Sequence, residues 1–288
     1  MFRARLPARV SPRSRFSVAP RRIPAAWWSV VLVALALAGP AARAAPRATA
    51  IAQVAVLYDG ARGTTPDAQG FVFLASPPLL AVARQEYAGG ATTLDSAAAR
   101  RDAAGYFVRE SAVPTLDRTA GYTVSLTLQI LAENHDGSAR GGDAWDDRAG
   151  FSLIVLSSDR RGVELGFWQD RVWAQADGRD AAQPIFTQAE GAAFDTTAAL
   201  TTYELHVLGD SYALLAGGAP LLSGPLRDYT GFEPEPLQPD PYETPNLVFL
   251  GDDTGAAYVR ARVAGVAAST AVPQHAGGQA IALPFVTH

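Results

Sequence analysis

The chain has 288 residues, a net charge of −4 at pH 7 and no Cys, and all 24 of its basic residues are Arg. Without Cys there can be no disulfide framework, so a large hydrophobic core must hold the fold. Hydrophobic residues make up 48% of the chain, which is enough for such a core.

The first 44 residues have the composition of an export signal. They contain eight Arg and no acidic residue, then the apolar run Ala25 to Ala38 and the small-residue site Ala42-Arg43-Ala44. This order of regions predicts a signal peptide over residues 1–44 and a secreted or periplasmic protein. The apolar run is short for a membrane span, which needs about 20 residues. An uncleaved anchor is the alternative.

Removal of that segment would change the charge. The remaining chain keeps 16 Arg and all 28 acidic residues, which gives a net charge of −12. Such a charge argues against nucleic acid or an anionic membrane as partner, and we expect no stable membrane anchor after cleavage. We predict one domain over residues 45–270 and a tail over 271–288.

Short strands separated by turn residues are predicted in the first part of this domain. They cover residues 51–58, 70–74, 92–95 and 105–108, while residues 81–90 are ambiguous. The turns between them contain Asp-Gly and Pro-Asp pairs, which are typical of tight turns.

Residues 121–175 hold the clearest pattern. Apolar and polar residues alternate from Tyr122 to Ile130, which predicts a half-buried strand, and 151–156 is a nearly continuous apolar run. The segments 163–168 and 171–175 flank Gln169-Asp170, a spacing that predicts a two-residue hairpin.

The register of that hairpin defines two faces. Phe167 opposite Val172 and Leu165 opposite Ala174 would face a core. The other face, which we call the polar face, would carry Glu164, Trp168, Arg171, Trp173 and Gln175 around Gly166. An aromatic side chain across from a strand glycine commonly fills its missing volume. The polar face is therefore either a sugar-stacking platform or ordinary cross-strand packing.

The second half of the chain continues with short strands. An extended segment at 185–191 and one helical turn at 196–200 precede a hairpin, 203–208 with 211–215, around Gly209-Asp210. Further strands are expected at 220–223, 246–250 and 258–264, with a proline-rich loop at 231–245. Many short strands at this spacing predict an all-β antiparallel sandwich or jelly roll. The expected core residues are Phe151, Leu153, Val155, Leu165, Phe167, Leu205, Val207, Tyr212, Leu214, Leu247 and Phe249.

The order of these segments resembles a known family. RAGFSLIVLSSD, GVELGFW and VWAQ, followed by YELHVLGDSYALLAGGAPLLSGPL, look like a concanavalin A-like lectin or glucanase sandwich of laminin-G type. The resemblance covers roughly residues 50–270 and extends to secreted bacterial proteins of this fold without an assigned activity. The resemblance implies the fold. It does not select a function, because the family includes lectins, glycosidases, lyases and adhesion modules.

The glucanase branch of that family carries E-x-D-x-E on one strand. Here the corresponding strand reads Glu164-Leu165-Gly166-Phe167-Trp168, so two of the three acids are missing. A glycosidase normally needs two carboxylates. Nucleotide-binding loops and the Gly-x-Ser-x-Gly hydrolase motif are also absent. The sequence therefore contains no complete catalytic motif and gives no catalytic residues. This favours a protein that is not an enzyme, with an enzyme as the alternative.

Acidic residues suggest a calcium site. The loop 134–148 contains Asp143, Asp146 and Asp147, and Asp252 and Asp253 follow a later strand. Calcium takes six to eight oxygen ligands, and relatives of laminin-G type often bind it at the rim of the sandwich. A solvated acidic loop is the alternative. His135 and His206 have no metal-site spacing and are expected at the surface.

Three functions agree with these features. The first is a secreted, non-catalytic recognition module that binds glycan or a cell-surface partner, assisted by calcium. The second is a polysaccharide-active enzyme, a glycosidase or lyase, with Glu164 and a partner such as Glu204 in a groove. The third is a structural envelope or matrix protein without a small ligand.

Overall fold

A computed structural model describes residues 53–98, 102–108, 112–135, 148–180, 183–234 and 240–270. The predicted signal peptide and the C-terminal tail lie outside the described residues. The described residues belong to one compact unit that starts at Ala50. None of the described helices is long and apolar enough to cross a bilayer.

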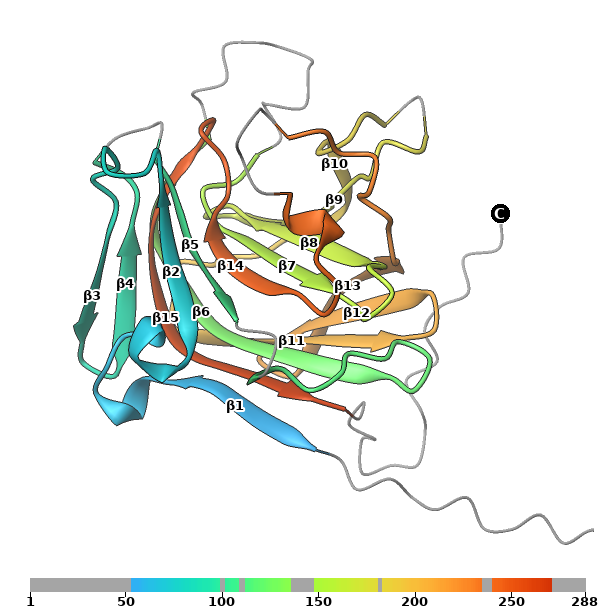
Figure 1. Ribbon diagram of the computed structural model, residues 1–288, viewed down its shortest axis with the longest axis horizontal. Coiled ribbons are helices and arrows are strands. Elements are labelled where there is room, and N and C mark those ends of the chain that lie inside the picture. The colour runs from blue at the N-terminus through green and yellow to red at the C-terminus, as the bar shows by residue number, and fades with distance from the viewer. Residues whose placement is uncertain are drawn as a thin grey trace, which may run out of the picture. The chain divides into compact units, whose positions relative to one another are not determined.

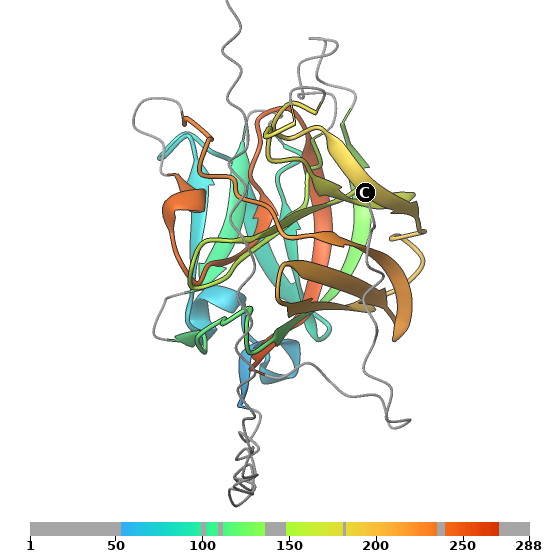
Figure 2. The same cartoon turned by 90° about the vertical axis from the view of Figure 1, so that its right-hand side faces the viewer.

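Two antiparallel sheets form a sandwich (Figures 1 and 2). Sheet A has the order β13 (Ala219–Pro225), β12 (Ser211–Ala216), β11 (Thr201–Leu208), β6 (Tyr122–Asn134), β15 (Tyr258–Ser269), β4 (Ala91–Asp95) and β3 (Arg84–Ala88), and β1 (Val54–Asp59) also pairs with β15. Sheet B has the order β10 (Gln188–Ala193), β9 (Arg171–Gln175), β8 (Gly162–Phe167), β7 (Ser152–Leu156), β14 (Val248–Asp252), β5 (Ala103–Val108) and β2 (Phe71–Ser76).

Helices in the described part of the chain are short 3-10 turns. They are η1 (Gly60–Arg62), η2 (Pro66–Gln69) and η5 (Pro241–Glu243). The prediction of an all-β antiparallel sandwich is confirmed.

Strand β15 joins the halves of sheet A. It pairs with β6 along one edge, and with β4 and β1 along the other. In Figure 1, β15 and β6 run together through the sheet. The segment predicted as 258–264 is longer in the structure because the alternation continues to Ser269.

The main core lies between the two sheets. The alternating side chains of β6 from Tyr122 to Ile130 point into it and have no exposed surface. The hairpin of β11 and β12 is confirmed in its predicted register, with Val207 opposite Tyr212 and a positive φ of 62° at Gly209. Such a φ favours glycine because it has no Cβ.

Nine of the eleven predicted core residues belong to this main core, and two belong elsewhere. In β14, Val248 and Leu250 point inward, so Phe249 faces outward and is only half-buried. Leu247 is buried but belongs to a second cluster. The prediction had the inward face of this strand wrong, because a short apolar run does not show which face is inside.

That second cluster lies on the outer face of sheet B. Ile154 and Leu156 of β7 pack there with Tyr229, Tyr242 and Leu247. Phe186, Phe232 and Phe249 pack against them. The predicted loop 231–245 therefore carries apolar side chains that cover the sheet.

The predicted helical turn at residues 196–200 is wrong. Thr196 instead donates its N–H to the Gln169 carbonyl and its hydroxyl to the Trp168 carbonyl. These bonds hold the segment against sheet B, and it does not form a helical turn.

Candidate functional site

The polar face has the predicted register but is covered. Leu165 lies opposite Ala174, Gly166 opposite Trp173 and Phe167 opposite Val172. Trp173 fills the space above Gly166, because a Cβ on that glycine would be 2.6 Å from the Trp173 Cζ2 atom. This aromatic filling was predicted.

Three of the five polar-face residues have no exposed surface. Glu164, Trp173 and Gln175 are 0% exposed, so a ligand from solvent cannot reach them in this structure. The prediction that these three residues bind a ligand on an open platform is therefore corrected. They are buried because the second cluster covers the outer face of sheet B. Trp168 and Arg171 keep partly exposed side chains.

Glu164 is the centre of a buried hydrogen-bond network. It accepts hydrogen bonds from the Tyr242 hydroxyl and from Ser152 Oγ, the latter at 3.3 Å. Arg148 Nη1 lies 3.5 Å from Glu164 Oε1, and Arg148 Nη2 lies 2.6 Å from Asp253 Oδ2. Burial, followed by the charge of Asp253, raises the pKa of Glu164 to about 7.

This arrangement does not form the predicted enzymatic pair. Glu164 is enclosed on the outer face of sheet B. Glu204 alternates with the core residues Tyr203 and Leu205 of β11, so it faces away from the core on sheet A. The two carboxylates therefore belong to opposite outer faces and cannot flank one sugar bond.

Two of the five predicted calcium ligands are described, and the protein already occupies both. Asp252 accepts hydrogen bonds from Ser96 Oγ and Thr254 N–H, and burial raises its pKa well above the ordinary range. Asp253 is held by Arg148. Asp143, Asp146 and Asp147 lie outside the described residues. The described part of the chain contains no group of three His, Cys, Asp or Glu residues arranged for a metal ion.

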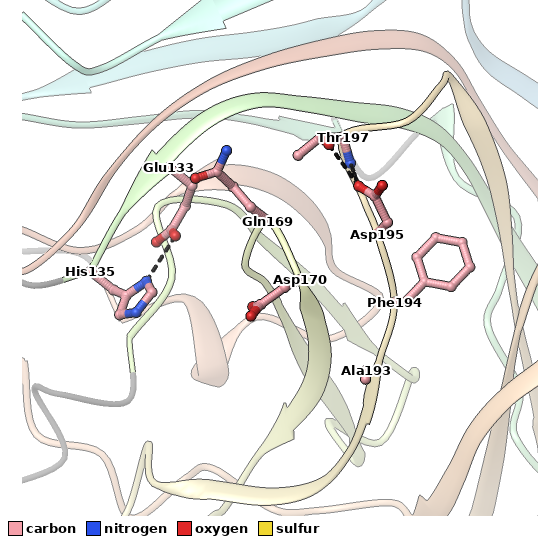
Figure 3. A pocket seen from close by; sticks show the side chains of 8 residues that line it. All are labelled: Glu133, His135, Gln169, Asp170, Ala193, Phe194, Asp195 and Thr197. Carbon is pink, nitrogen blue, oxygen red and sulfur yellow. Dashed lines mark hydrogen bonds and ion pairs between the residues drawn. The ribbon is translucent and has the colours of Figure 1, made fainter.

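An open pocket of about 720 Å³ lies at the end of the sandwich next to the polar face. We call it the rim pocket, and Figure 3 shows its side chains. Its lining residues are Glu133, His135, Gln169, Asp170, Ala193, Phe194, Asp195 and Thr197.

Three separate segments build the rim pocket. Glu133 and His135 come from the end of β6, and Gln169 and Asp170 form the turn between β8 and β9. Ala193 ends β10, and the connection to β11 supplies the rest. In Figure 3 the Asp170 carboxylate points between the Glu133–His135 pair and the segment that carries Asp195.

The connection between β10 and β11 is fixed to both sheets. Phe194 N–H donates to the Asp170 carbonyl at 2.9 Å in sheet B. Ile130 N–H and Gln129 Nε2 of β6 donate to the carbonyls of Thr196 and Thr197 at 3.1 and 2.8 Å. The wall of the pocket is therefore held in place without a ligand.

The pocket adjoins the polar face, because its lining residue His135 contacts Trp168. His135 Nδ1 lies 2.9 Å from Glu133 Oε2, and the His135 ring stacks on Trp168 with centroids 3.8 Å apart. Trp168 Nε1 donates to the Arg148 carbonyl at 3.0 Å, and its ring lies 4.5 Å from that of Trp173. The covered tryptophan thus supports the accessible one.

None of the eight residues that line the pocket was predicted as a site residue. Gln169 and Asp170 were identified only as a turn, and His135 as a surface residue; it is half-buried in this stack. His206 was also expected at the surface but is 3% exposed. The Asp195-Thr196-Thr197 sequence is a signal that could have been used, because Asp side chains commonly bond the backbone two residues on.

No known family model matches this sequence, and no curated protein sequence matches it. Solved structures with a similar fold include the carbohydrate esterase vb_24B_21 of the Shiga toxin-encoding bacteriophage phi24B. It is 11% identical, the match covers 75% of this chain and 99% of that one, and the TM-score is 0.47.

Two further similar structures are carbohydrate-binding domains. The metal-free carbohydrate recognition domain of Emp46p is 9% identical over 76% of this chain and 97% of that one, with a TM-score of 0.43. The exoplasmic/lumenal domain of VIP36, bound to Ca²⁺ and Man3GlcNAc, is 10% identical over 77% and 90%, with a TM-score of 0.44. Similarity at this level does not assign a function, which must come from the residues of the site.

Proposed function

We propose that this chain is an exported glycan-recognition module without catalytic activity, and that the rim pocket is its binding site. The observation that carries this proposal is the preformed pocket itself. Six of its eight lining residues have polar side chains, and one of them, His135, stacks on Trp168. Sites for small ligands are commonly concave, with a few well-placed polar groups.

The chemistry of the pocket suits sugar hydroxyl groups. Asp170 and Asp195 are acceptors, Gln169 both donates and accepts, and Thr197 adds a hydroxyl group. Trp168 and Arg171, the two partly exposed residues of the polar face, extend this surface. The buried Trp173 packs against Trp168.

Calcium assistance is part of the proposal. Its ligands would be Asp143, Asp146 and Asp147. Of the two candidate ligands in the described part of the chain, Asp253 is the more suitable. Asp253 keeps one carboxylate oxygen, Oδ1, without a hydrogen bond in the described part of the chain. Asp252 fits less well because its burial favours the protonated form.

We further propose that the signal peptide directs the protein to the periplasm or the exterior. Its partner there would be a glycan or a glycan-bearing surface protein. The strongly acidic mature chain supports a partner other than nucleic acid.

The polysaccharide-active enzyme is not favoured by the pair Glu164 and Glu204, because the two carboxylates lie on opposite outer faces of the sandwich. The alternative to be tested is a structural envelope or matrix protein that binds no small ligand. A glycan array probed with the mature chain, with and without calcium, separates it from the recognition module.

The array should include Asp170→Ala and, as a matched control, Glu86→Ala. Glu86 is an exposed residue on β3, in the other sheet. We expect Asp170→Ala to lose binding while its melting temperature stays close to that of the parent, and Glu86→Ala to bind normally. Absence of binding to every polysaccharide class would overturn the proposed function and favour the matrix protein.

A further inference from the structure

We propose that the rim pocket selects glycans that carry free amino groups, such as oligomers of glucosamine without N-acyl substituents. This inference rests on the proposed function and names the class of ligand. It follows from the charges that line the pocket and from an unsatisfied hydroxyl behind its wall.

Among the described residues, the lining of the pocket contains carboxylates and no Arg or Lys. Glu133 is paired with His135, whereas Asp170 is exposed and its carboxylate points into the middle of the pocket (Figure 3). Asp195 uses Oδ1 to accept from both Thr197 N–H and Thr197 Oγ1, at 2.9 and 2.6 Å. These bonds lower the pKa of Asp195, so it stays ionised near neutral pH.

An ammonium group fits this lining, and a carboxylate on the ligand does not. Opposite charges that approach within hydrogen-bond distance form charge-assisted bonds. A uronic acid would instead place its own negative charge next to Asp170 and Asp195, and like charges at an interface are unfavourable. The pocket is therefore expected to discriminate by charge.

Tyr203 supplies the second observation. It is 1% exposed, and its hydroxyl has no hydrogen-bond partner in the part of the chain that the structure describes. Its ring packs edge-on against Phe194, a lining residue, with centroids 5.8 Å apart. Burial, and after it the charge of Asp195, raises the pKa of Tyr203.

A buried hydroxyl without a partner is uncommon in folded proteins, because losing its hydrogen bonds to water costs free energy. Because the hydroxyl is buried, the missing partner would be one ordered water that bridges it to a ligand amine next to Asp195. The orphaned hydroxyl thus points to a bound donor at the same wall where the carboxylates favour a cation.

The test is calorimetric titration of the mature chain with three hexasaccharides: glucosamine, N-acetylglucosamine and galacturonate. The titrations are run in low salt and at a pH at which the glucosamine amines are charged. We expect the glucosamine oligomer to bind tightest and its affinity to fall as salt increases. Asp170→Asn and Asp195→Asn should each weaken it by roughly two- to fivefold, as for a partly exposed ion pair.

Glu86→Gln is the control for attraction by the overall negative charge. It removes the same charge from the exposed face of β3 and should leave the affinity unchanged. If it weakens binding as much as Asp170→Asn does, pocket selection is overturned. Tyr203→Phe should weaken the glucosamine oligomer selectively, and an unchanged affinity would overturn the role of the hydroxyl.

The inference and the proposed function fail in different ways. Equal or tighter binding of the N-acetylated oligomer, with loss of binding in a Gln169→Ala/Asp170→Ala variant, overturns the amine preference and leaves the glycan site in place. Tight binding of galacturonate overturns the charge argument alone. No binding of any of the three oligomers, in agreement with an empty glycan array, overturns both.

Discussion

Gly166 of β8 pairs with Ser152 of β7 and with Trp173 of β9, and the Trp173 ring packs on it. A Cβ there would lie 2.6 Å from Trp173 Cζ2, and the ring has no exposed side toward which to move. We predict that Gly166→Ala lowers the free energy of unfolding by about 1–3 kcal/mol, as overpacked substitutions do. Urea denaturation of the parent and the variant measures this loss of stability.

The matched control is Gly231→Ala. A Cβ at Gly231 meets no atom within 4 Å. Its unfolding free energy should stay within about 0.5 kcal/mol of the parent. Equal effects at the two positions would mean that Trp173 does not pack on Gly166.

Glu164 is predicted to make stability depend on pH. Its pKa rises from an ordinary 4.5 to about 7 in the folded state, first through burial and then through the charge of Asp253. Between these two values the folded state holds a proton that the unfolded state has lost. Stability from this group is therefore present below about pH 4.5 and falls as the pH rises through about 7.

Glu164→Gln removes this titration and keeps the shape of the side chain. Unfolding free energies of both proteins at about pH 5 and about pH 8 measure the difference. We expect the parent to lose more stability than the variant over this range. A parallel change in both proteins would show that Glu164 is ionised throughout.

At the scale of elements, Arg148 joins the segments that cover sheet B. It contacts Glu164 of β8 and Asp253 after β14, and its guanidinium lies 4.3 Å from the Phe186 ring centroid. Removing one partner leaves the other charges buried and unpaired, so we predict that Arg148→Ala costs about 3–5 kcal/mol. Thermal and urea unfolding measure this cost.

Arg84→Ala is the comparison at the surface. Arg84 pairs with Asp95 at 3.3 Å, but its side chain is 71% exposed. A pair of this kind contributes about 0–1 kcal/mol, so the variant should be close to the parent. Comparable losses in the two variants would contradict the role of Arg148 as a buried link.

The strands could be predicted because their signal is local. Alternation at Tyr122–Ile130 and the two-residue spacing at Gln169-Asp170 define strand and register without any tertiary contact. The cover over sheet B could not be predicted. Tyr229 and Tyr242 lie in proline-rich connections without periodicity, so nothing local indicates that they pack on Glu164.

The rim pocket was beyond local prediction for a related reason. Its lining comes from residues 133–135, 169–170 and 193–197, which meet only when both sheets have formed. The aromatic and charged residues of the polar face were visible in sequence. Which of these side chains stay accessible to solvent depends on the second cluster that covers sheet B. For this reason Trp168 is partly exposed, whereas Trp173 is buried.

At the scale of the whole molecule, calcium is predicted to raise the melting temperature. An ion that binds only the folded state stabilises it by about 2.7 kcal/mol at a hundredfold excess over Kd. We expect melting in millimolar calcium to exceed melting in chelator, and Asp143→Asn/Asp146→Asn/Asp147→Asn to abolish the difference. An unchanged melting temperature in the parent would remove the calcium part of the proposal.

The central place of β15 has a consequence for biogenesis. A ribosome-bound chain that ends before Tyr258 leaves β6 without its partner on one edge and leaves β4, β3 and β1 unconnected to the rest of sheet A. Domains generally fold as units, and these pairings join residues far apart in sequence. We therefore expect the nascent polypeptide to stay incompletely folded until β15, the last strand of the described residues, has been synthesised.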